Sequence, residues 1–370
     1  MTVHRNNDQI SSAQLAAILS VTIIGIGILT LPRTLTEAVG PDGWIVVVAG
    51  SFSSLLIGLL IVSLVKRFPK QTIVEFSADL VGKPIGTMLS VGFCVYFIIF
   101  SAIEARVFGE IAKMYLLFRT PIEVLIISLL LTAAYLVRSG IEPIARMAQI
   151  IFPIAILTAL IVILPVLPDI DWSNLMPVFK TPIVKLLKAI PIAFFSFAGL
   201  EIILLFGAYV IDPKKMPNSI YLTIGLVAAT YIFVTMVVVA RFGLVESTHI
   251  IWPTLEIFKT IDIPGAFIEN IQIYVISIWI LSVFMTLVAF YFGASLTLSR
   301  ILKSKEQNYF VLPLLLIIYF IALVPDNLGQ VTDYMELFSN YGGTLYILVI
   351  PIVFWGISTF KKKQGGKKGA

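Results

Sequence analysis

Two glycines interrupt the first hydrophobic stretch of the chain, and their backbone is well placed to bind a solute. The stretch runs from about Ser12 to Ala38, and its middle reads Gly25-Ile26-Gly27. Roughly 20 apolar residues span a bilayer, so these helix-weakening glycines fall near mid-membrane. A helix unwound there frees backbone N–H and C=O groups, which bind zwitterions and ions. The alternative is that the glycines only allow close helix packing.

A second potential break lies in the sixth hydrophobic stretch and is followed by an acid. Phe195, Ser196, Phe197 and Ala198 precede a glycine, and Glu201 follows that glycine two residues later. We expect the four residues before the glycine to bind the solute together with the first break. For an amino acid, the ammonium would meet carbonyl groups freed around Phe195 to Phe197, and the carboxylate would meet N–H groups near Gly25 to Gly27. A carboxylate inside a membrane segment is costly, so Glu201 is predicted to carry a proton, to act as a gate or to cap the local break.

The third and eighth stretches supply further candidates for the wall of the site. Phe97, Ser101 and Glu104 recur at three- and four-residue spacing and therefore share one helical face. We expect Phe97, Ser101 and Thr286 to line the site, and Glu104 to be a second proton-carrying or gating acid. The alternative for such hydroxyls is a hydrogen bond to their own helix backbone.

The sequence offers little for catalysis or for a cofactor. Both histidines, His4 and His249, lie outside the hydrophobic stretches, and no spacing is typical of a metal site. There is no glycine-rich phosphate loop, and the acids within the stretches have no partner histidine. We therefore expect a protein that is not an enzyme and that binds neither cofactor nor metal.

Composition indicates which elements position these residues. The chain has 370 residues, 59% hydrophobic and 13% charged, with a mean hydropathy of +1.01, whereas soluble domains are about half apolar and a quarter charged. This is the composition of a multi-pass membrane protein, with no nucleic-acid-binding patch and no cleavable signal peptide evident.

Ten membrane-spanning helices are predicted near residues 12–38, 43–65, 84–118, 121–138, 143–165, 184–210, 217–242, 265–303, 309–324 and 334–360. The connections 165–182 and 243–264 are each expected to carry a short interfacial helix.

Lysine and arginine predict the orientation of these spans. With the N-terminus on the cytoplasmic side, seventeen of the 26 cationic residues lie inside and eight outside, and Arg106 falls within a span. Both termini are then cytoplasmic. Spans one and six are interrupted and spans three and eight are unusually long, which predicts two five-helix repeats of inverted topology. We assign residues 1–165 to the first repeat, 184–360 to the second and 361–370 to a basic cytoplasmic tail, all within a single transmembrane domain.

The residues also resemble a known family over essentially the whole chain. The segments Ile10–Gln14, Gly25–Pro32, Phe194–Glu201 and Asp212–Lys215 are similar to those of the endospore germination permeases, the B subunits of spore nutrient germinant receptors. These permeases are part of the amino acid–polyamine–organocation superfamily. The resemblance implies an all-α, leucine-transporter-like fold, residence in the spore inner membrane, and partner subunits of the A and C types. It also implies a small nutrient ligand, commonly an amino acid, held at the breaks of spans one and six.

Three functions remain open from the sequence. The first is a sensor that binds an amino acid between the two breaks and signals to partner subunits. The second is a proton-coupled amino acid permease in which Glu104 or Glu201 carries the proton. A span-five lysine found in some proton-coupled relatives is missing here, because that span reads Phe152–Thr158 without one. The third is a structural scaffold within a complex.

Overall fold

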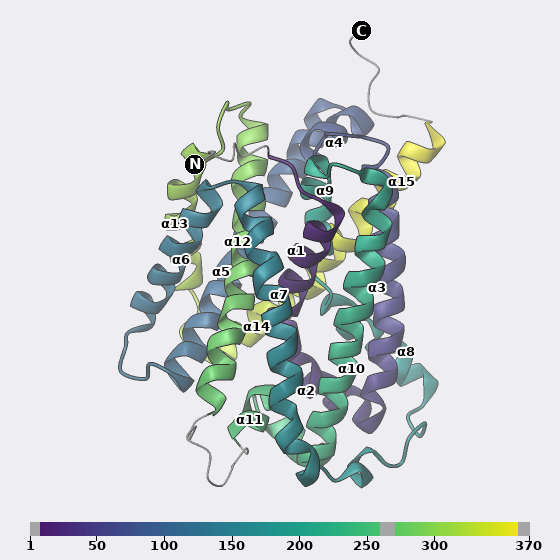
Figure 1. Cartoon of the computed structure of the whole chain (residues 1–370). Coiled ribbons are helices and arrows are strands. Elements are labelled where there is room, and N and C mark those ends of the chain that lie inside the picture. Colours follow the sequence, from purple (N-terminus) through teal and green to yellow (C-terminus); the bar gives the residue numbers. More distant parts are fainter. Residues whose placement is uncertain (1–7, 260–270, 362–370) are drawn as a thin grey trace.

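The computed structural model describes residues 8–259 and 271–361, and these residues are almost entirely helical (Figure 1). The α-helices are α1 (Ser12–Ile24), α2 (Gly27–Val39), α3 (Gly43–Val65), α4 (Ile73–Val81), α5 (Lys83–Tyr115), α6 (Ile122–Arg138), α7 (Ile141–Ile163), α8 (Ile183–Phe195), α9 (Ile203–Phe206), α10 (Met216–His249), α11 (Pro253–Lys259), α12 (Ile271–Ile301), α13 (Asn308–Ala322), α14 (Leu328–Phe338) and α15 (Ile350–Phe360). The 3-10 helices are η1 (Gly40–Asp42), η2 (Leu164–Asp169), η3 (Trp172–Leu175), η4 (Leu200–Ile202), η5 (Gly207–Tyr209) and η6 (Pro213–Lys215), and η7 (Ser339–Val349) is a π-helix.

Both predicted breaks are present. The first span is divided into α1 and α2, and Gly25 between them has φ −26° and ψ −107°, outside the helical region. The sixth span is divided after α8, where Gly199 adopts a left-handed φ of +115° that favours glycine. The segment Leu200–Tyr209 then leaves α8 at an angle of 49°.

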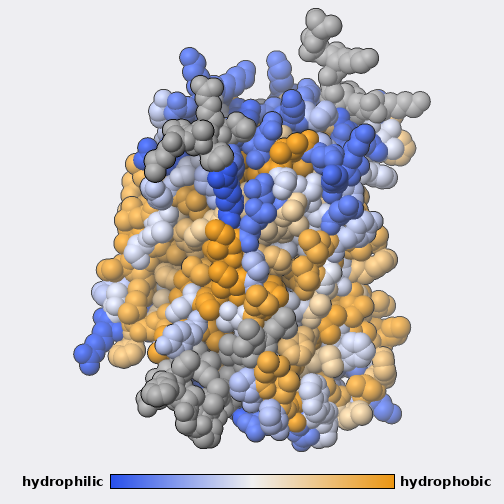
Figure 2. All heavy atoms as spheres, in the orientation of Figure 1, coloured by the Kyte–Doolittle hydropathy of each residue, from blue (hydrophilic) through white to orange (hydrophobic). Residues whose placement is uncertain are grey.

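Length and apolar composition identify six helices within the described residues as able to cross a membrane, or seven when the bent sixth span is included. Two further helices, α1 and α13, are apolar but shorter. These findings confirm an all-α membrane protein, while the count of ten spans stays a prediction. On the face shown in Figure 2, apolar side chains form a broad belt across the middle, and hydrophilic residues gather at the upper end.

Helix packing follows the reciprocal pattern expected of an inverted repeat. The first span packs on the seventh, since α1 and α2 both lie against α10, and the sixth span packs on the second through α8 and α3. The long helices α5 and α12, of 33 and 31 residues, run along each other at the centre. Spans three and eight are therefore the shared axis around which the two broken spans are placed.

Some elements differ from the sequence prediction. The helix α4 was not predicted; it begins with a capping box between Thr72 and Glu75 and buries Phe76 and Leu80. The predicted end of the seventh span at 242 coincides with a kink at Gly243 (φ +71°, ψ 176°), and α10 continues beyond that kink to His249, inside the predicted connection 243–264. The tenth begins earlier, at α14, and passes through η7 before α15.

The two long connections contain short helices, as predicted. Residues 165–182 include the 3-10 helices η2 and η3, and residues 243–264 include α11. The part of the second connection at 260–264, and the start of the predicted eighth span at 265–270, lie outside the described residues.

Candidate functional site

The carbonyl groups freed at the two breaks accept hydrogen bonds from aromatic side chains of other spans. The Tyr231 hydroxyl of α10 lies 2.8 Å from the Ile23 carbonyl oxygen and 3.1 Å from that of Ser196. Trp279 of α12 donates its indole N–H to the Gly25 carbonyl at 2.9 Å. Tyr231 therefore joins the first break to the sixth-span break, and Trp279 fixes the first break to the eighth span.

Gly25 faces two polar side chains from the central helices α5 and α12. A Cβ atom at this position would lie 2.6 Å from Thr286 Oγ1 and 3.4 Å from Glu104 Oε1. The Thr286 hydroxyl is 3.1 Å from both the Thr22 carbonyl and the Ser282 carbonyl of its own helix. The structure thus brings Gly25, Glu104 and Thr286 together, as the solute-site prediction requires, and it also shows the own-helix bond expected under the alternative for Thr286.

Glu104 is the least satisfied polar group of this region. Its side chain is only 2% exposed, and its Oε2 atom has no hydrogen-bond partner among the described residues. Buried polar atoms almost always have a hydrogen-bond partner, because a buried atom without one loses about 1–3 kcal/mol of stability. The orphaned oxygen therefore marks a position where a proton, a water molecule or a cationic group of a ligand is chemically favourable.

Glu201, in contrast, has a partner on each carboxyl oxygen. The Tyr96 hydroxyl donates to Oε1 at 2.7 Å, and the Gly199 backbone N–H donates to Oε2 at 2.8 Å. Because Gly199 is the left-handed residue of the sixth-span break, Glu201 satisfies a backbone donor that the break frees. This is the capping geometry anticipated for Glu201.

The remaining residues of the first break, Ile26 and Gly27, lie around the Tyr231 bridge. Ile26 is 7% exposed, and a Cβ atom on Gly27 would lie 2.5 Å from the Tyr231 hydroxyl and 3.1 Å from the Ser196 carbonyl oxygen. The Phe197 ring meets the Tyr231 ring edge-on, with centroids 5.4 Å apart. Gly27, Ser196 and Phe197 therefore meet at Tyr231, between the two breaks.

The structure gives four other predicted solute-binding residues contacts outside the Gly25–Tyr231 region. Ser101 bonds the Phe97 carbonyl of its own helix at 2.8 Å, and Phe97 packs on Gly293 of α12. Seven residues, or about 10 Å of helix, separate Phe97 from Glu104. Phe195 lies against Gly343 of the π-helix, and Ala198 is half-buried beside the hydrophobic core.

A small cavity of about 60 Å³ lies beside the first break. Its lining is almost entirely apolar and includes Ile24, Ile28 and Trp279, together with Leu255 and Phe258 of α11. Thr254 of α11 donates to the Ile28 carbonyl at 2.8 Å. The short helix α11 thus closes this side of the break and is joined to it by a buried hydrogen bond.

Sequence reasoning missed Tyr231 and Trp279, although both bind the breaks directly. Each is an aromatic residue with a polar atom inside an otherwise apolar span, and such atoms find a partner when buried. That signal was available in the sequence. The identity of the partner was not, because Tyr231 and Ile23 are far apart in the chain and meet only through the packing of α10 on α1.

Comparison with known proteins points to one family. The sequence pattern of the family described as spore germination protein matches residues 9–331. Spore germination protein YndE of Bacillus subtilis (strain 168) is 31% identical over 357 residues, covering 96% of this chain and 98% of that protein. Spore germination protein B2 of the same organism is 27% identical, and the match covers 98% of this chain and 99% of that protein.

Solved structures of solute transporters share the fold at low sequence identity. MhsT in complex with L-phenylalanine superposes with a TM-score of 0.68 at 14% identity, covering 94% of this chain and 88% of that chain. A Na+-coupled sialic acid symporter gives 0.67 at 12% identity, covering 90% and 78%. These likenesses confirm the predicted leucine-transporter-like fold with broken helices in spans one and six.

Proposed function

This chain belongs to the spore germination protein family, and we propose that it is the nutrient-sensing B subunit of a spore germinant receptor. In this proposal it binds a small solute, an amino acid in the first instance, between the breaks of the first and sixth spans. Binding shifts the population of helix arrangements, and A-type and C-type partner subunits in the spore inner membrane respond. The role is one of binding and signalling, without an enzymatic step.

The observation that carries this proposal is the buried carboxyl group of Glu104, whose Oε1 faces Gly25 and whose Oε2 has no partner among the described residues. A ligand ammonium group placed there would supply the partner that Oε2 lacks among the described residues. The ligand carboxylate would then meet the N-terminal end of α2, where the capping position Ile26 has no side-chain hydrogen bond to the helix. Helix N-termini favour anions because their backbone N–H groups are unpaired.

This pose differs from the one that the sequence favoured for the ammonium group. From the sequence, the ammonium group was expected at carbonyl groups freed around Phe195 to Phe197. In the structure, the Ser196 carbonyl oxygen among them already lies 3.1 Å from the Tyr231 hydroxyl. A carboxylate is also the stronger partner, because it carries a full negative charge that attracts the ammonium group, whereas a backbone carbonyl is only a dipole. We therefore place the ammonium at Glu104.

The test is direct binding combined with uptake. Purified protein is screened against amino acids by thermal shift, because a ligand that binds only the folded state raises the melting temperature. Glu104→Gln should weaken the affinity for the stabilising amino acid at least about tenfold, the expected loss of a charged hydrogen bond. Glu123→Gln, at an exposed position of α6, is the matched control and should bind normally. Equal affinity in Glu104→Gln and wild type would reject the site.

A proton-coupled amino acid permease is the second candidate, and the same residue supports it. A buried carboxyl group without a partner is suited to take up and release a proton. Liposomes containing the protein alone distinguish the two functions. The sensor binds its amino acid without accumulating it, whereas the permease accumulates it in response to a pH gradient and loses that accumulation in Glu104→Gln.

A further inference from the structure

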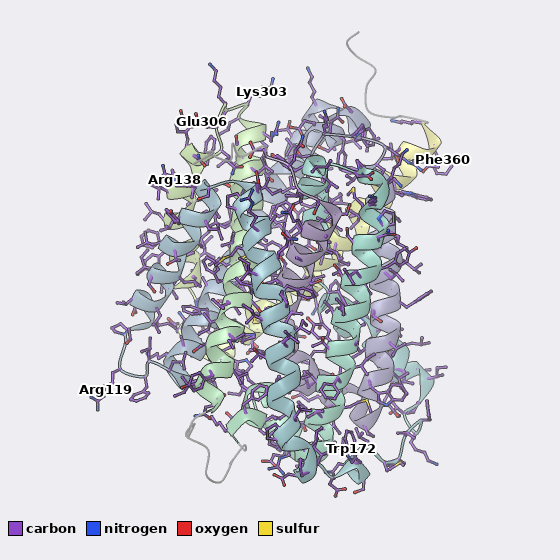
Figure 3. All side chains as sticks on the ribbon, viewed as in Figure 1. Arg119, Arg138, Trp172, Lys303, Glu306 and Phe360 are labelled. Atoms are coloured by element: carbon purple, nitrogen blue, oxygen red, sulfur yellow. The ribbon has the colours of Figure 1, made fainter. Side chains whose placement is uncertain are left out.

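A polar cavity of about 420 Å³ opens at the end of the molecule opposite α11, well away from the two breaks. Three cationic side chains line it: Arg138 at the end of α6, Arg300 near the end of α12, and Lys305 in the connection to α13. Figure 3 shows Arg138 at this end of the bundle, with Lys303 and Glu306 nearby. Buried Phe292 and Leu296 of α12 also line the cavity.

Two of the cations at this cavity are not paired with its acids. The acidic side chains that line it are Asp8 and Glu306, against three cations. Arg300 is partly neutralised, since it lies 3.6 Å from Glu75 and bonds the Tyr209 hydroxyl at 3.3 Å. Within the described part of the chain, Arg138 and Lys305 form no ion pair, so both remain available to an anion.

Backbone geometry adds to this positive character. The helices α7 and α13 both begin at the cavity, at Ile141 and Asn308, and both of these residues line it. The capping position of α13, Gln307, makes no side-chain hydrogen bond to the helix. The unpaired N–H groups of a helix N-terminus carry a partial positive charge and bind phosphates and other anions.

We propose that this cavity is a phosphate-binding site, distinct from the solute site and independent of the proposed germinant. Arg138 and Lys305 provide the charge, Arg300 is held in place by Tyr209 and Glu75, and the start of α13 provides backbone donors. Arginine and lysine together with helix N-termini are the common partners of phosphate groups. The cavity volume falls within the range of small-ligand sites, about 300–1,000 Å³.

The phosphate has two possible sources, a free phosphorylated solute or the headgroup of an anionic phospholipid. The cavity lies at a polar end of the bundle, beyond the apolar belt (Figure 2), where phospholipid headgroups also lie. Basic pockets at the ends of membrane helices bind such headgroups. Both sources present the same phosphate oxygens to the same side chains.

The experiment uses the purified full-length protein in two arms. In the first, inorganic phosphate is titrated into protein in detergent at constant ionic strength, and binding is followed calorimetrically. In the second, the protein is released from nanodiscs of phosphatidylglycerol or of phosphatidylcholine in a native mass spectrometer, and the lipid molecules that stay bound to it are counted. We expect wild type to bind in at least one arm, and the arm that responds identifies the source.

The double variant Arg138→Gln/Lys305→Gln should lower binding at least about tenfold, because two charged partners are removed. Arg119→Gln/Lys180→Gln removes the same charge from exposed positions away from the cavity and should bind as wild type. Lys305→Glu, a single change at an exposed loop position, is the second variant should the first fail to fold. Wild type that binds in neither arm, site variants that bind normally, or a control that loses binding equally would each overturn the proposal.

Discussion

At the scale of single residues, the absence of a side chain at Gly25 lets polar groups of Glu104 and Thr286 approach the first break. The glycine itself could be predicted from the sequence as a site of unwinding. Its environment could not, because Glu104 and Thr286 come from spans three and eight and reach Gly25 only through the packing of α5 and α12 on α1. A single sequence shows which residues share a face of one helix, but it does not show which residues of two helices meet.

Gly25→Ala should therefore damage the site sterically. The new methyl group would lie 2.6 Å from Thr286 Oγ1, and such overpacking typically costs about 1–3 kcal/mol. We expect a lower melting temperature and an affinity for the germinant amino acid reduced by more than about tenfold.

The variant Gly25→Ala/Thr286→Ala separates the two effects. It removes the clashing hydroxyl and leaves the Thr286 Cβ and Glu104 Oε1, each 3.4 Å away, so melting temperature should recover relative to Gly25→Ala. Affinity should stay low, because the methyl group still occupies ligand space. Normal affinity in Gly25→Ala at normal expression would mean that this glycine serves only helix packing.

At the scale of elements, Glu201 holds the sixth-span break against α5. The acid and the neighbouring glycine were visible in the sequence, and so was the possibility of a cap. Tyr96 was not identified as the second partner, although its hydroxyl completes the arrangement. The π-helix η7 was not foreseen either, because its hydrogen-bond register is a property of the packed backbone rather than of a residue pattern.

Replacements of Glu201 should rank by how many of its two hydrogen bonds survive. In Glu201→Gln, the amide oxygen can still accept from Gly199 and the amide N–H₂ can donate to the Tyr96 oxygen, so the effect on stability is small. Glu201→Leu leaves the Gly199 N–H and the Tyr96 hydroxyl without their acceptor, at about 1–3 kcal/mol for each buried group. Thermal unfolding of the purified variants, with expression level as a second measure, tests the order.

Tyr96→Phe is the matched control for this series. It removes one hydrogen bond and keeps the ring in its aromatic cluster with Phe338 and Tyr346, so its stability should fall between those of Glu201→Gln and Glu201→Leu. Complete loss of ligand response in both Glu201 variants, at normal expression, would instead indicate an essential charge and favour the proton-coupled permease.

At the scale of the whole molecule, hydropathy and the two interrupted spans were sufficient to predict the architecture. Most observed helices begin and end within a few residues of the predicted spans, as with α3 and α6. Larger differences occur where tertiary contacts decide the outcome, as in the helix α4, which was not predicted and packs on α5. The boundaries of the two repeats, at 165 and 184, stay predictions, and so does the orientation of the chain in the membrane.

Orientation is testable because cationic residues gather at one end of the bundle. Figure 3 places Arg138, Lys303 and Glu306 at that end and Arg119 and Trp172 at the other. By the positive-inside rule the first end faces the cytoplasm during synthesis.

The single native cysteine, Cys94, is buried, so it should react little with a membrane-impermeant maleimide, and wild type serves as the background control. Arg119→Cys should be labelled in intact cells, and Glu306→Cys only after permeabilisation. Both changes are at exposed positions and should leave folding intact. The reverse labelling pattern would invert the topology, and would place the phosphate-binding cavity on the outer face and the short helix α11 on the inner one.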